Sequence, residues 1–286
     1  MFNQNIKSPV NIPVSKIHPF EGNPYKVLDN DEMNNLIESI QQKGVISPIV
    51  VRPLENTDDE YELISGHRRL RASVKAGLET VPALIYAVTR DEAAIMLVDS
   101  NLYREHILPS EKAFAYKLKL EAMKRQGERT DLTSRQLVGK LESADLVSDT
   151  ESGRQVQRYI RLTYLIPELL ELVDERRIAF TPAVELSYLN EVEQADLVEE
   201  IRVCDATPNL SQAQRLRAIS REAGLTPEHI GEILAEEKAN QREKIKIPAE
   251  RIRKYFPKSY TTEQIEEAII KICESRYRAR QGRDAR

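Results

Sequence analysis

Residues that favour β-strands are confined to the first third of this chain, and this restricts its fold more than any other feature. Two β-branched runs, GVISPIVVRP (44–53) and EYELIS (60–65), flank the polar segment LENTDD, which predicts a hairpin. TVPALIYAV (80–88) predicts another strand, and NIPVSKIHPF (11–20) predicts one short edge strand with proline at its margins. Because helical patterns lie between these runs, we expect a mixed α+β domain over residues 1–107.

After Ile107 the chain shows helical periodicity and almost no strand pattern. PSEKAFAYKLKLEAMKRQG (109–127) predicts a long helix that Ser110 caps and Gly127 ends. Further short helices follow, and a proline-bearing break precedes the last one, TTEQIEEAIIKICESRYRAR (261–280). We expect an all-α domain over residues 108–237 and a small, basic helical C-terminal region over residues 238–286.

Charge is distributed unevenly along the chain. The formal net charge is −4, which by itself argues against a nucleic-acid partner. However, residues 108–166 hold 11 basic and 8 acidic side chains, residues 167–237 hold 6 and 16, and residues 238–286 hold 14 and 7. Two basic stretches therefore flank an acidic one, and this asymmetry indicates a nucleic-acid partner better than the total does. An ordinary solvated surface is the alternative.

The cysteines, histidines and apolar runs exclude several other classes. Cys204 and Cys273 lack metal-ligand spacing and the four histidines are scattered, so we expect free thiols of a reducing compartment and no zinc site. The N-terminal residues MFNQNIKSPVNIPV lack the apolar core of a secretory signal. No apolar run reaches the roughly 18 residues of a membrane span. The sequence therefore predicts a cytoplasmic protein with no membrane partner.

The segment ELISGHRRLRASVKAG (62–77) places Arg68, Arg69 and Arg71 where a strand gives way to a helix that Gly77 closes. The first N–H groups of a helix lack partners and the helix dipole adds positive potential there, so clustered arginines require an anion or access to water. Gly66 lets a bulky anion approach the backbone closely. We interpret the segment as a phosphate-binding turn. Alternatively, the arginines extend into solvent or pair with carboxylates such as Glu60 or Glu62.

A second cluster has helix-turn-helix character. TSRQLVGKL (133–141) is followed by SGRQVQRYIRL (152–162), in which three arginines lie on one helical face beside two glutamines. Such a face suits the major groove, since arginine can bind guanine and glutamine can bind adenine through two hydrogen bonds. The connection ESADLVSDTE is longer than the usual turn, and a solvated face of an ordinary helix is the alternative. The predicted DNA-contacting residues are Arg135, Gln136, Lys140, Arg154, Gln155, Gln157, Arg158 and Arg161.

Four boxes in order resemble the ParB/Spo0J/Noc partition family. ISGHRRLRAS is similar to the family's Gly-Glu-Arg-Arg box, and GVISPIVVRP and TVPALI resemble the strands on either side of it. DSNLYREHILPSEKAFAY resembles the segment that leads from the N-terminal domain into the DNA-binding helices. The resemblance is good from about Pro13 to Leu170 and looser beyond.

The resemblance implies a nucleotide site and a set of partners. In that family the boxes bind the triphosphate of CTP with Mg²⁺, and the nucleotide closes a dimeric clamp on DNA. The implied partners are therefore double-stranded DNA, a second copy of the chain and a ParA-type ATPase, at the nucleoid. Asn101 would lie near the Mg²⁺ and Arg104 would support the pocket. The implied nucleotide-binding residues are Gly66, His67, Arg68, Arg69, Arg71, Asn101 and Arg104.

Two positions depart from the family pattern. His67 stands where the first box usually has Glu, and Ser100 stands where the second box has Glu before its Asn. The second change removes a carboxylate, which is the group that a hard cation such as Mg²⁺ favours. We therefore expect nucleotide binding more than efficient CTP hydrolysis.

Two other functions stay open. The changes at His67 and Ser100 favour a nucleotide-independent transcription regulator that keeps the N-terminal domain as a scaffold. The same N-terminal fold also resembles sulfiredoxin, whose turn needs a Cys that SGHRR lacks, and certain ADP-dependent serine kinases. Asp99 and Glu105 could supply a kinase base, but a kinase gives no reason for the helix-turn-helix.

The last predicted helix carries a stripe of apolar residues: Ile265, Ala268, Ile269, Ile272 and Cys273. This stripe suits a dimer seam or packing on its own chain. The arginines that follow it suit non-specific contact with DNA, or a solvated terminus.

Overall fold

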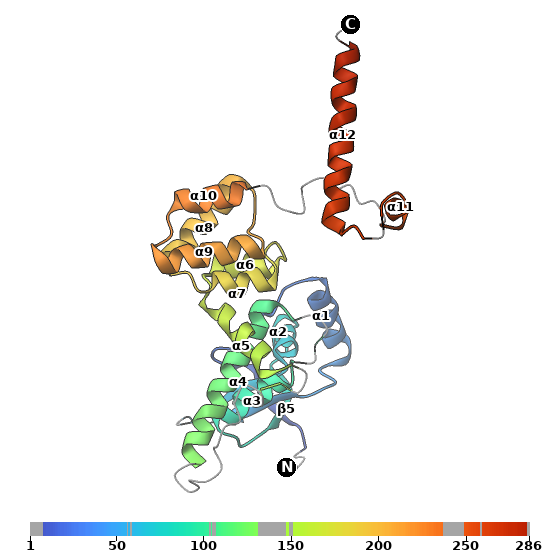
Figure 1. Cartoon of the computed structure of the whole chain (residues 1–286). Helices are drawn as coiled ribbons and strands as arrows, with labels where there is room; N and C mark the ends of the chain where they lie inside the picture. The colour runs from blue at the N-terminus through green and yellow to red at the C-terminus, as the bar shows by residue number, and fades with distance from the viewer. Residues whose placement is uncertain are drawn as a thin grey trace. The chain divides into compact units, whose positions relative to one another are not determined.

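The computed structural model describes residues 8–55, 57, 59–102, 104, 107–130, 147–148, 151–236, 249–257 and 259–284. The chain divides into two compact units, Met1–Glu236 and Glu237–Arg286 (Figure 1). The larger unit begins with a five-stranded sheet and continues as helices. Its strands are β1 (Val10–Pro13), β2 (Ile17–Pro19), β3 (Ile49–Pro53), β4 (Tyr61–Ser65) and β5 (Thr80–Ile85).

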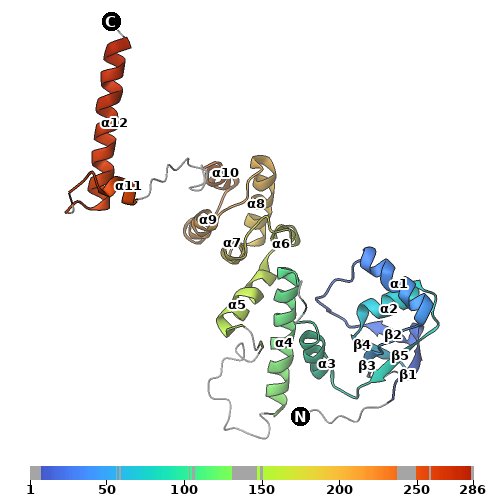
Figure 2. The same cartoon turned by 90° about the vertical axis from the view of Figure 1, so that its right-hand side faces the viewer.

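Helices surround and follow this sheet (Figure 2). Those of the N-terminal part are α1 (Asp31–Lys43), α2 (His67–Lys75) and α3 (Arg90–Asp99). The rest of the larger unit holds α4 (Pro109–Thr130), α5 (Gly153–Arg161), α6 (Pro167–Asp174), α7 (Phe180–Leu186), α8 (Glu191–Cys204), α9 (Leu210–Glu222) and α10 (Pro227–Ala235), with short 3₁₀ turns η1 (Val14–Lys16) and η2 (Leu162–Tyr164). The smaller unit holds α11 (Ala249–Arg253) and α12 (Thr262–Asp284). No helix among the described residues is long and apolar enough to cross a membrane.

The sheet has the strand order β1-β5-β3-β4-β2, in which β3 pairs with β4 in antiparallel and with β5 in parallel orientation. The predicted single edge strand at residues 11–20 is wrong. That segment forms β1, the turn η1 and then β2, and these two strands are the opposite edges of the sheet.

The short link between the two edges requires a curled sheet. From Pro13 to Ile17 the chain can span roughly 14 Å, whereas the edges of a flat five-stranded sheet lie about 19 Å apart. The sheet must therefore curl until β1 and β2 approach each other. Its inner core contains Leu63 of β4 and Leu70 of α2, together with Ile12, Ile17, Ile49, Val51, Val81 and Ala83.

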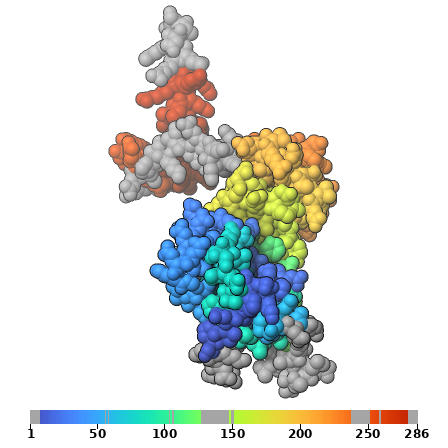
Figure 3. Space-filling view, turned by 180° about the vertical axis from the view of Figure 1, so that it is seen from behind, coloured from blue at the N-terminus to red at the C-terminus, as the bar shows by residue number. Residues whose placement is uncertain are grey.

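Both faces of β4 are buried, because adjacent strand residues point to opposite sides. Leu63 faces the curled interior, while Ile64 packs against α3 and α4. Small side chains dominate this second contact, which lets the two helices approach closely: Ala93, Ala94, Ala115 and Ala122. Figure 3 shows one face of the N-terminal part of the chain, coloured blue to cyan.

Helix α4 joins the cores of the larger unit. Ala115 packs on the sheet side, Tyr116 packs against α5, and Ala113 contributes to the apolar cluster that α6 to α10 enclose. The expected limits of α4 were wrong at both ends. Ser110 lies inside the helix, because the Leu108 carbonyl already accepts from the Lys112 N–H, and the helix continues through Gly127 to Thr130.

Candidate functional site

The turn before α2 has a conformation that only glycine adopts easily. Gly66 caps α2 with φ +102°, in the left-handed region. A Cβ at this position would lie 2.8 Å from Cγ2 of Ile49 on β3. Glycine is therefore required here both by the positive φ and by the close approach of Ile49. Because it has no side chain, it leaves the first N–H groups of α2 uncovered.

The three arginines of this turn have partners within the protein. Nη2 of Arg68 lies 2.9 Å from the Glu32 carboxylate of α1. Arg71 forms two hydrogen bonds with Asp29, which also pairs with Lys75. The Arg71 guanidinium, and to a smaller extent the Lys75 ammonium group, hold the pKa of Asp29 well below its usual range. Two of the arginines therefore pair with carboxylates, as the alternative interpretation expected. Their partners are Glu32 of α1 and Asp29, which precedes the α1 cap.

The carboxylates expected as partners are occupied elsewhere. Glu62 accepts from Nε of Arg52 at 2.6 Å, and Glu60 lies 3.2 Å from His18. The third arginine, Arg69, donates from Nη1 to the backbone carbonyls of Ser47 and Pro48, both at 2.6 Å. Burial lowers the pKa of the Arg69 guanidinium. Arg69 therefore ties α2 to the segment that enters β3.

His67 is the first residue of α2 and carries an unsatisfied buried atom. Its Nε2 is shielded from solvent and has no hydrogen-bond partner among the described residues. Burial, with a smaller contribution from the nearby Arg104 guanidinium, lowers the pKa of His67 to about 4. The imidazole is therefore neutral at pH 7 and can form one further hydrogen bond.

Arg104, which follows α3, lies near His67 of the α2 turn. The Arg104 N–H donates to the carbonyl of Asn101, and the Arg104 guanidinium lies over the ring of Tyr25 at 5.7 Å. Burial raises the pKa of Tyr25, while Arg104 opposes that rise. The structure thus brings together His67 and Arg104, which are far apart in sequence.

Asn101 tests the fit of a hard cation. Its side chain is 4% exposed, and its amide nitrogen donates to the Leu97 carbonyl at 2.7 Å. Oδ1 has no hydrogen-bond partner within the part of the chain that is described. Neither His67 nor Ser100 supplies a carboxylate, and the described residues contain no group of three or more His, Cys, Asp or Glu side chains suited to a metal. Any Mg²⁺ here would have no protein carboxylate, so it would depend on phosphate and water oxygens together with the Asn101 amide oxygen.

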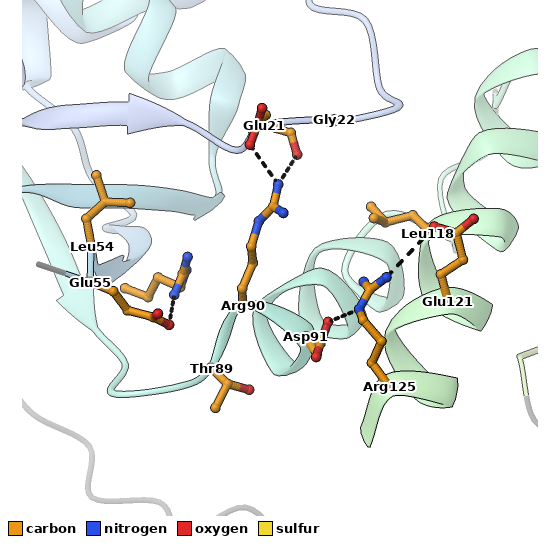
Figure 4. A pocket seen from close by; sticks show the side chains of 11 residues that line it. Glu21, Gly22, Leu54, Glu55, Thr89, Arg90, Asp91, Leu118, Glu121 and Arg125 are labelled. Carbon is orange, nitrogen blue, oxygen red and sulfur yellow. Dashed lines mark hydrogen bonds and ion pairs between the residues drawn. The ribbon is translucent and has the colours of Figure 1, made fainter. Parts of the chain in front are cut away.

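A cavity of about 850 Å³ lies elsewhere, between the end of β3, the start of α3 and α4 (Figure 4). None of the residues predicted from the sequence lines it. Its guanidinium groups are already paired with carboxylates: Arg52 with Glu62, Arg90 with Glu21, and Arg125 with Asp91. The cavity is an ion-paired groove, and the candidate nucleotide site is the turn before α2 because that turn carries the predicted arginine motif.

Helix α5 begins at Gly153, directly after its cap. Ser152 caps it by accepting a hydrogen bond from the Gln155 N–H, and Val156 faces the core. Arg154 and Gln157 are exposed. Arg158 is half-buried: it donates to Gln155 and Thr181 and lies 5.0 Å from the Phe180 ring. Part of the predicted DNA-contacting face is thus free, and part is held against α7.

Arg161, at the end of α5, is the most constrained of the predicted residues. It donates from Nε and Nη2 to the hydroxyl and carbonyl of Ser187. Its guanidinium also lies 4.0 Å from the ring centroid of Tyr188 and 4.5 Å from that of Tyr164. Sequence reasoning missed these tyrosines because neither belongs to a local motif. Arg135, Gln136 and Lys140, on the first predicted helix of the pair, lie outside the described residues.

The chain is similar to several known proteins. Residues 3–102 match the model of the ParB N-terminal domain. A nucleoid occlusion protein of Listeria innocua is 33% identical over 199 residues, which cover 69% of this chain and 64% of that protein. The chromosome-partitioning protein Spo0J of Thermus thermophilus is 34% identical over 169 residues, covering 59% and 56%.

A solved structure is also similar. The C-terminally truncated chromosome-partitioning protein ParB of Caulobacter crescentus, complexed with CTP-γ-S, matches with a TM-score of 0.33 and 23% identity, over 68% of this chain and 99% of that one. The matched part of this chain spans less than two thirds of the length of the two curated relatives. Residues 3–102 therefore match a ParB N-terminal domain, and the chain is similar to chromosome-partitioning and nucleoid occlusion proteins.

Proposed function

We propose that this chain is a sequence-specific DNA-binding protein of the partition type, acting in the segregation of a chromosome, plasmid or mobile element. The observation that carries the proposal is the capped helix α5, with Arg154 and Gln157 exposed on one face, in a chain that begins with a ParB N-terminal domain. Neither feature alone would suffice, since arginine faces are common on helices.

Helix α5 reads base edges in the major groove. Arg154 and Gln157 can each form two hydrogen bonds with one base, as guanine and adenine require. Arg158 is held by Gln155 and Thr181, so it is presented in a fixed orientation instead of as a flexible chain. Arg135, Gln136 and Lys140 contact DNA from the preceding predicted helix, mainly through phosphates.

The turn before α2 holds a nucleoside triphosphate, and the family resemblance assigns CTP. Gly66 lets phosphate oxygens approach the first N–H groups of α2. Arg68 exchanges its exposed carboxylate partner for phosphate at little cost. Arg71 exchanges the two hydrogen bonds that it forms with Asp29 for equivalent bonds to phosphate oxygens. Nε2 of His67 and the Arg104 guanidinium lie close enough to contribute to the same pocket.

Mg²⁺ would neutralise phosphate charge and arrive with the triphosphate. Oδ1 of Asn101 is the protein oxygen that we assign to it. Because His67 and Ser100 supply no carboxylate, the chain binds nucleotide without efficient hydrolysis.

Dimerisation completes the proposal. The stripe on α12 pairs with a second copy, and a nucleotide-closed dimer encircles the duplex. A ParA-type ATPase is the further partner that the family resemblance implies.

A second candidate is a nucleotide-independent DNA-binding regulator. It is favoured by the engagement of Arg68, Arg69 and Arg71 within the protein. Calorimetric titration with CTP and Mg²⁺ separates the two functions: heat of binding supports the nucleotide-dependent protein, and a flat trace supports the regulator.

Selection from randomised duplexes, with and without CTP at fixed salt, tests DNA recognition. A short enriched motif is expected, and Arg158→Ala should weaken binding to it by about 1–3 kcal/mol. Arg202→Ala, at an exposed pair with Glu199 on α8, is the control and should bind normally. If no motif is enriched by the unmodified chain, sequence-specific binding is wrong.

A further inference from the structure

Four side chains at the end of α5 form a surface cluster that the proposed function leaves unexplained. We name Tyr164, Arg161, Tyr188 and Arg217 the arginine–tyrosine column. They come from η2, α5, the connection after α7, and α9. Both tyrosines are exposed, Tyr164 at 57% and Tyr188 at 45%, so the column lies at the surface.

The two guanidinium groups sandwich one ring. The central carbons of Arg161 and Arg217 lie over the Tyr188 ring, 4.0 Å and 3.6 Å from its centroid. On the same side of the ring they would overlap, so they occupy opposite faces. Arg161 also lies over Tyr164. Aromatic rings and cations therefore alternate, an arrangement that arginine favours because its planar group stacks while its edges stay available for hydrogen bonds.

Each arginine keeps donors that the protein does not use. Nη1 of Arg217 donates to the Glu185 carboxylate at 2.7 Å, and Nε and Nη2 of Arg161 donate to Ser187. Nε and Nη2 of Arg217 and Nη1 of Arg161 have no hydrogen-bond partner among the residues that the structure describes. Because stacking fixes both guanidinium planes, an anion can bind these edges without ordering a flexible side chain first.

The positive charge of the arginine–tyrosine column favours an anionic partner. Residues 167–237 hold 16 acidic and 6 basic side chains, so most of this helical region repels phosphate. At the column, Lys117 joins the two arginines, since its Nζ lies 5.8 Å from the Tyr164 ring centroid. Three cations therefore lie around the two tyrosine rings, and one of them, Arg217, is paired with the Glu185 carboxylate.

The column is continuous with the helix that we assign to DNA. Arg161 belongs both to the α5 face that carries Arg154 and Gln157 and to the column, since positions 154, 157, 158 and 161 share one side of a helix. A duplex contacted by α5 would therefore bring its sugar–phosphate backbone close to Tyr188 and Arg217.

We propose that the arginine–tyrosine column binds phosphate groups of duplex DNA beside the bases that α5 contacts. Arginine and tyrosine are both frequent donors to phosphate oxygens. The column thereby fixes the orientation of α5 on the duplex without contributing to base preference. This inference rests on the proposed DNA-binding function.

Arg217→Gln tests the column, with Arg215→Gln as its matched control. Both arginines lie on α9, both pair with one glutamate, and both changes remove one charge; Arg215 pairs with Glu236, away from the column. Affinity for a fluorescein-labelled duplex of mixed random sequence is measured by anisotropy over a salt series. Arg217→Gln should reduce the slope of log affinity against log salt by about 0.9, the value for one lost phosphate contact. Arg215→Gln should leave the slope unchanged.

Two further measurements complete the test. Arg217→Lys keeps the charge and should keep the wild-type slope, and circular dichroism melting shows whether each variant is folded. Equal slopes for the wild type and Arg217→Gln, or equal losses in both glutamine variants, would overturn the column while leaving the DNA-binding function intact. If the unmodified chain shows no salt-dependent DNA binding, both proposals are wrong.

Discussion

Gly66 combines two constraints that normally occur separately, a left-handed backbone and a steric contact. Gly66→Ala should lower the free energy of unfolding by about 2–3 kcal/mol, because the methyl group adds overlap with Ile49 to the cost of a positive φ. Urea unfolding followed by circular dichroism measures the loss.

Gly77 provides the matched control for this substitution. It has φ +78°, and a methyl group at this position would meet no heavy atom within 4 Å, so Gly77→Ala carries only the backbone cost of about 1–2 kcal/mol. Equal losses for the two variants would mean that the contact with Ile49 relaxes at no cost.

His67 should make stability depend on pH. Burial lowers its pKa to about 4 in the folded protein, whereas an unfolded histidine titrates near 6.5. Below pH 6.5 the unfolded state binds a proton that the folded state refuses, so the free energy of unfolding falls as pH decreases from 6.5 towards 4. The full loss is at most about 3 kcal/mol.

Urea unfolding of the wild type and His67→Gln at several pH values between 4 and 7 measures this contribution. The difference between the two proteins should shrink or reverse towards pH 4, since glutamine does not titrate. Arg104→Gln, which removes the second cause of the lowered pKa, should give an intermediate slope. A constant difference across the range would show that His67 does not respond to pH.

At the scale of elements, helix α4 is held by a cap that another helix supplies. Asp174, the last residue of α6, accepts hydrogen bonds from the N–H and the hydroxyl of Ser110 in the first turn of α4. The first N–H groups of a helix have no partners within it, and a carboxylate also suits the positive end of the dipole. This contact joins α6 directly to the helix on which the sheet-side core depends.

Asp174→Asn should lower the free energy of unfolding by about 1–2 kcal/mol, as expected for the loss of a charged helix cap. Combining it with Ser110→Ala should cost less than the sum of the two single changes, because both remove the same contact. Exposed Glu171→Gln on α6 is the control and should change stability by less than about 0.5 kcal/mol. Fully additive losses would show that the two residues do not interact.

At the scale of the whole molecule, α12 leaves large apolar side chains exposed. Ile265 is buried, but Ile272 at 55% and Ile270 at 51% are open to solvent. Ile265 and Ile272 are seven residues apart and share one side of the helix, while Ile270 lies on another. A seam formed with a second copy would cover the first side only.

Ile272→Asp should therefore convert a dimer into a monomer, because a charge within an apolar seam is costly to bury. Light scattering coupled to size-exclusion chromatography measures the mass. Ile270→Asp is the control and should leave the dimer intact. A monomeric wild type, or dissociation by both variants alike, would contradict the proposed seam.

Much of the local structure followed from short sequence patterns. The β-branched runs 44–53 and 60–65 and the polar segment between them act within a few residues, so their spacing predicted the antiparallel pair of β3 and β4. The position of Gly66 at a strand-to-helix turn was predicted in the same way. Limits were less certain, and α4 continues beyond Gly127 because the helix tolerates a single glycine.

Contacts between distant segments were decided only in three dimensions. Residues 10–19 became two opposite sheet edges because the sheet curls, which no pattern within those residues reveals. Likewise, Arg68 and Arg71 form ion pairs with acidic residues at or just before the start of α1. Arg161 and Arg217 both stack on the Tyr188 ring. A guanidinium group can bind phosphate, bind carboxylate or stack on an aromatic ring, so its partner depends on which groups the fold brings within reach.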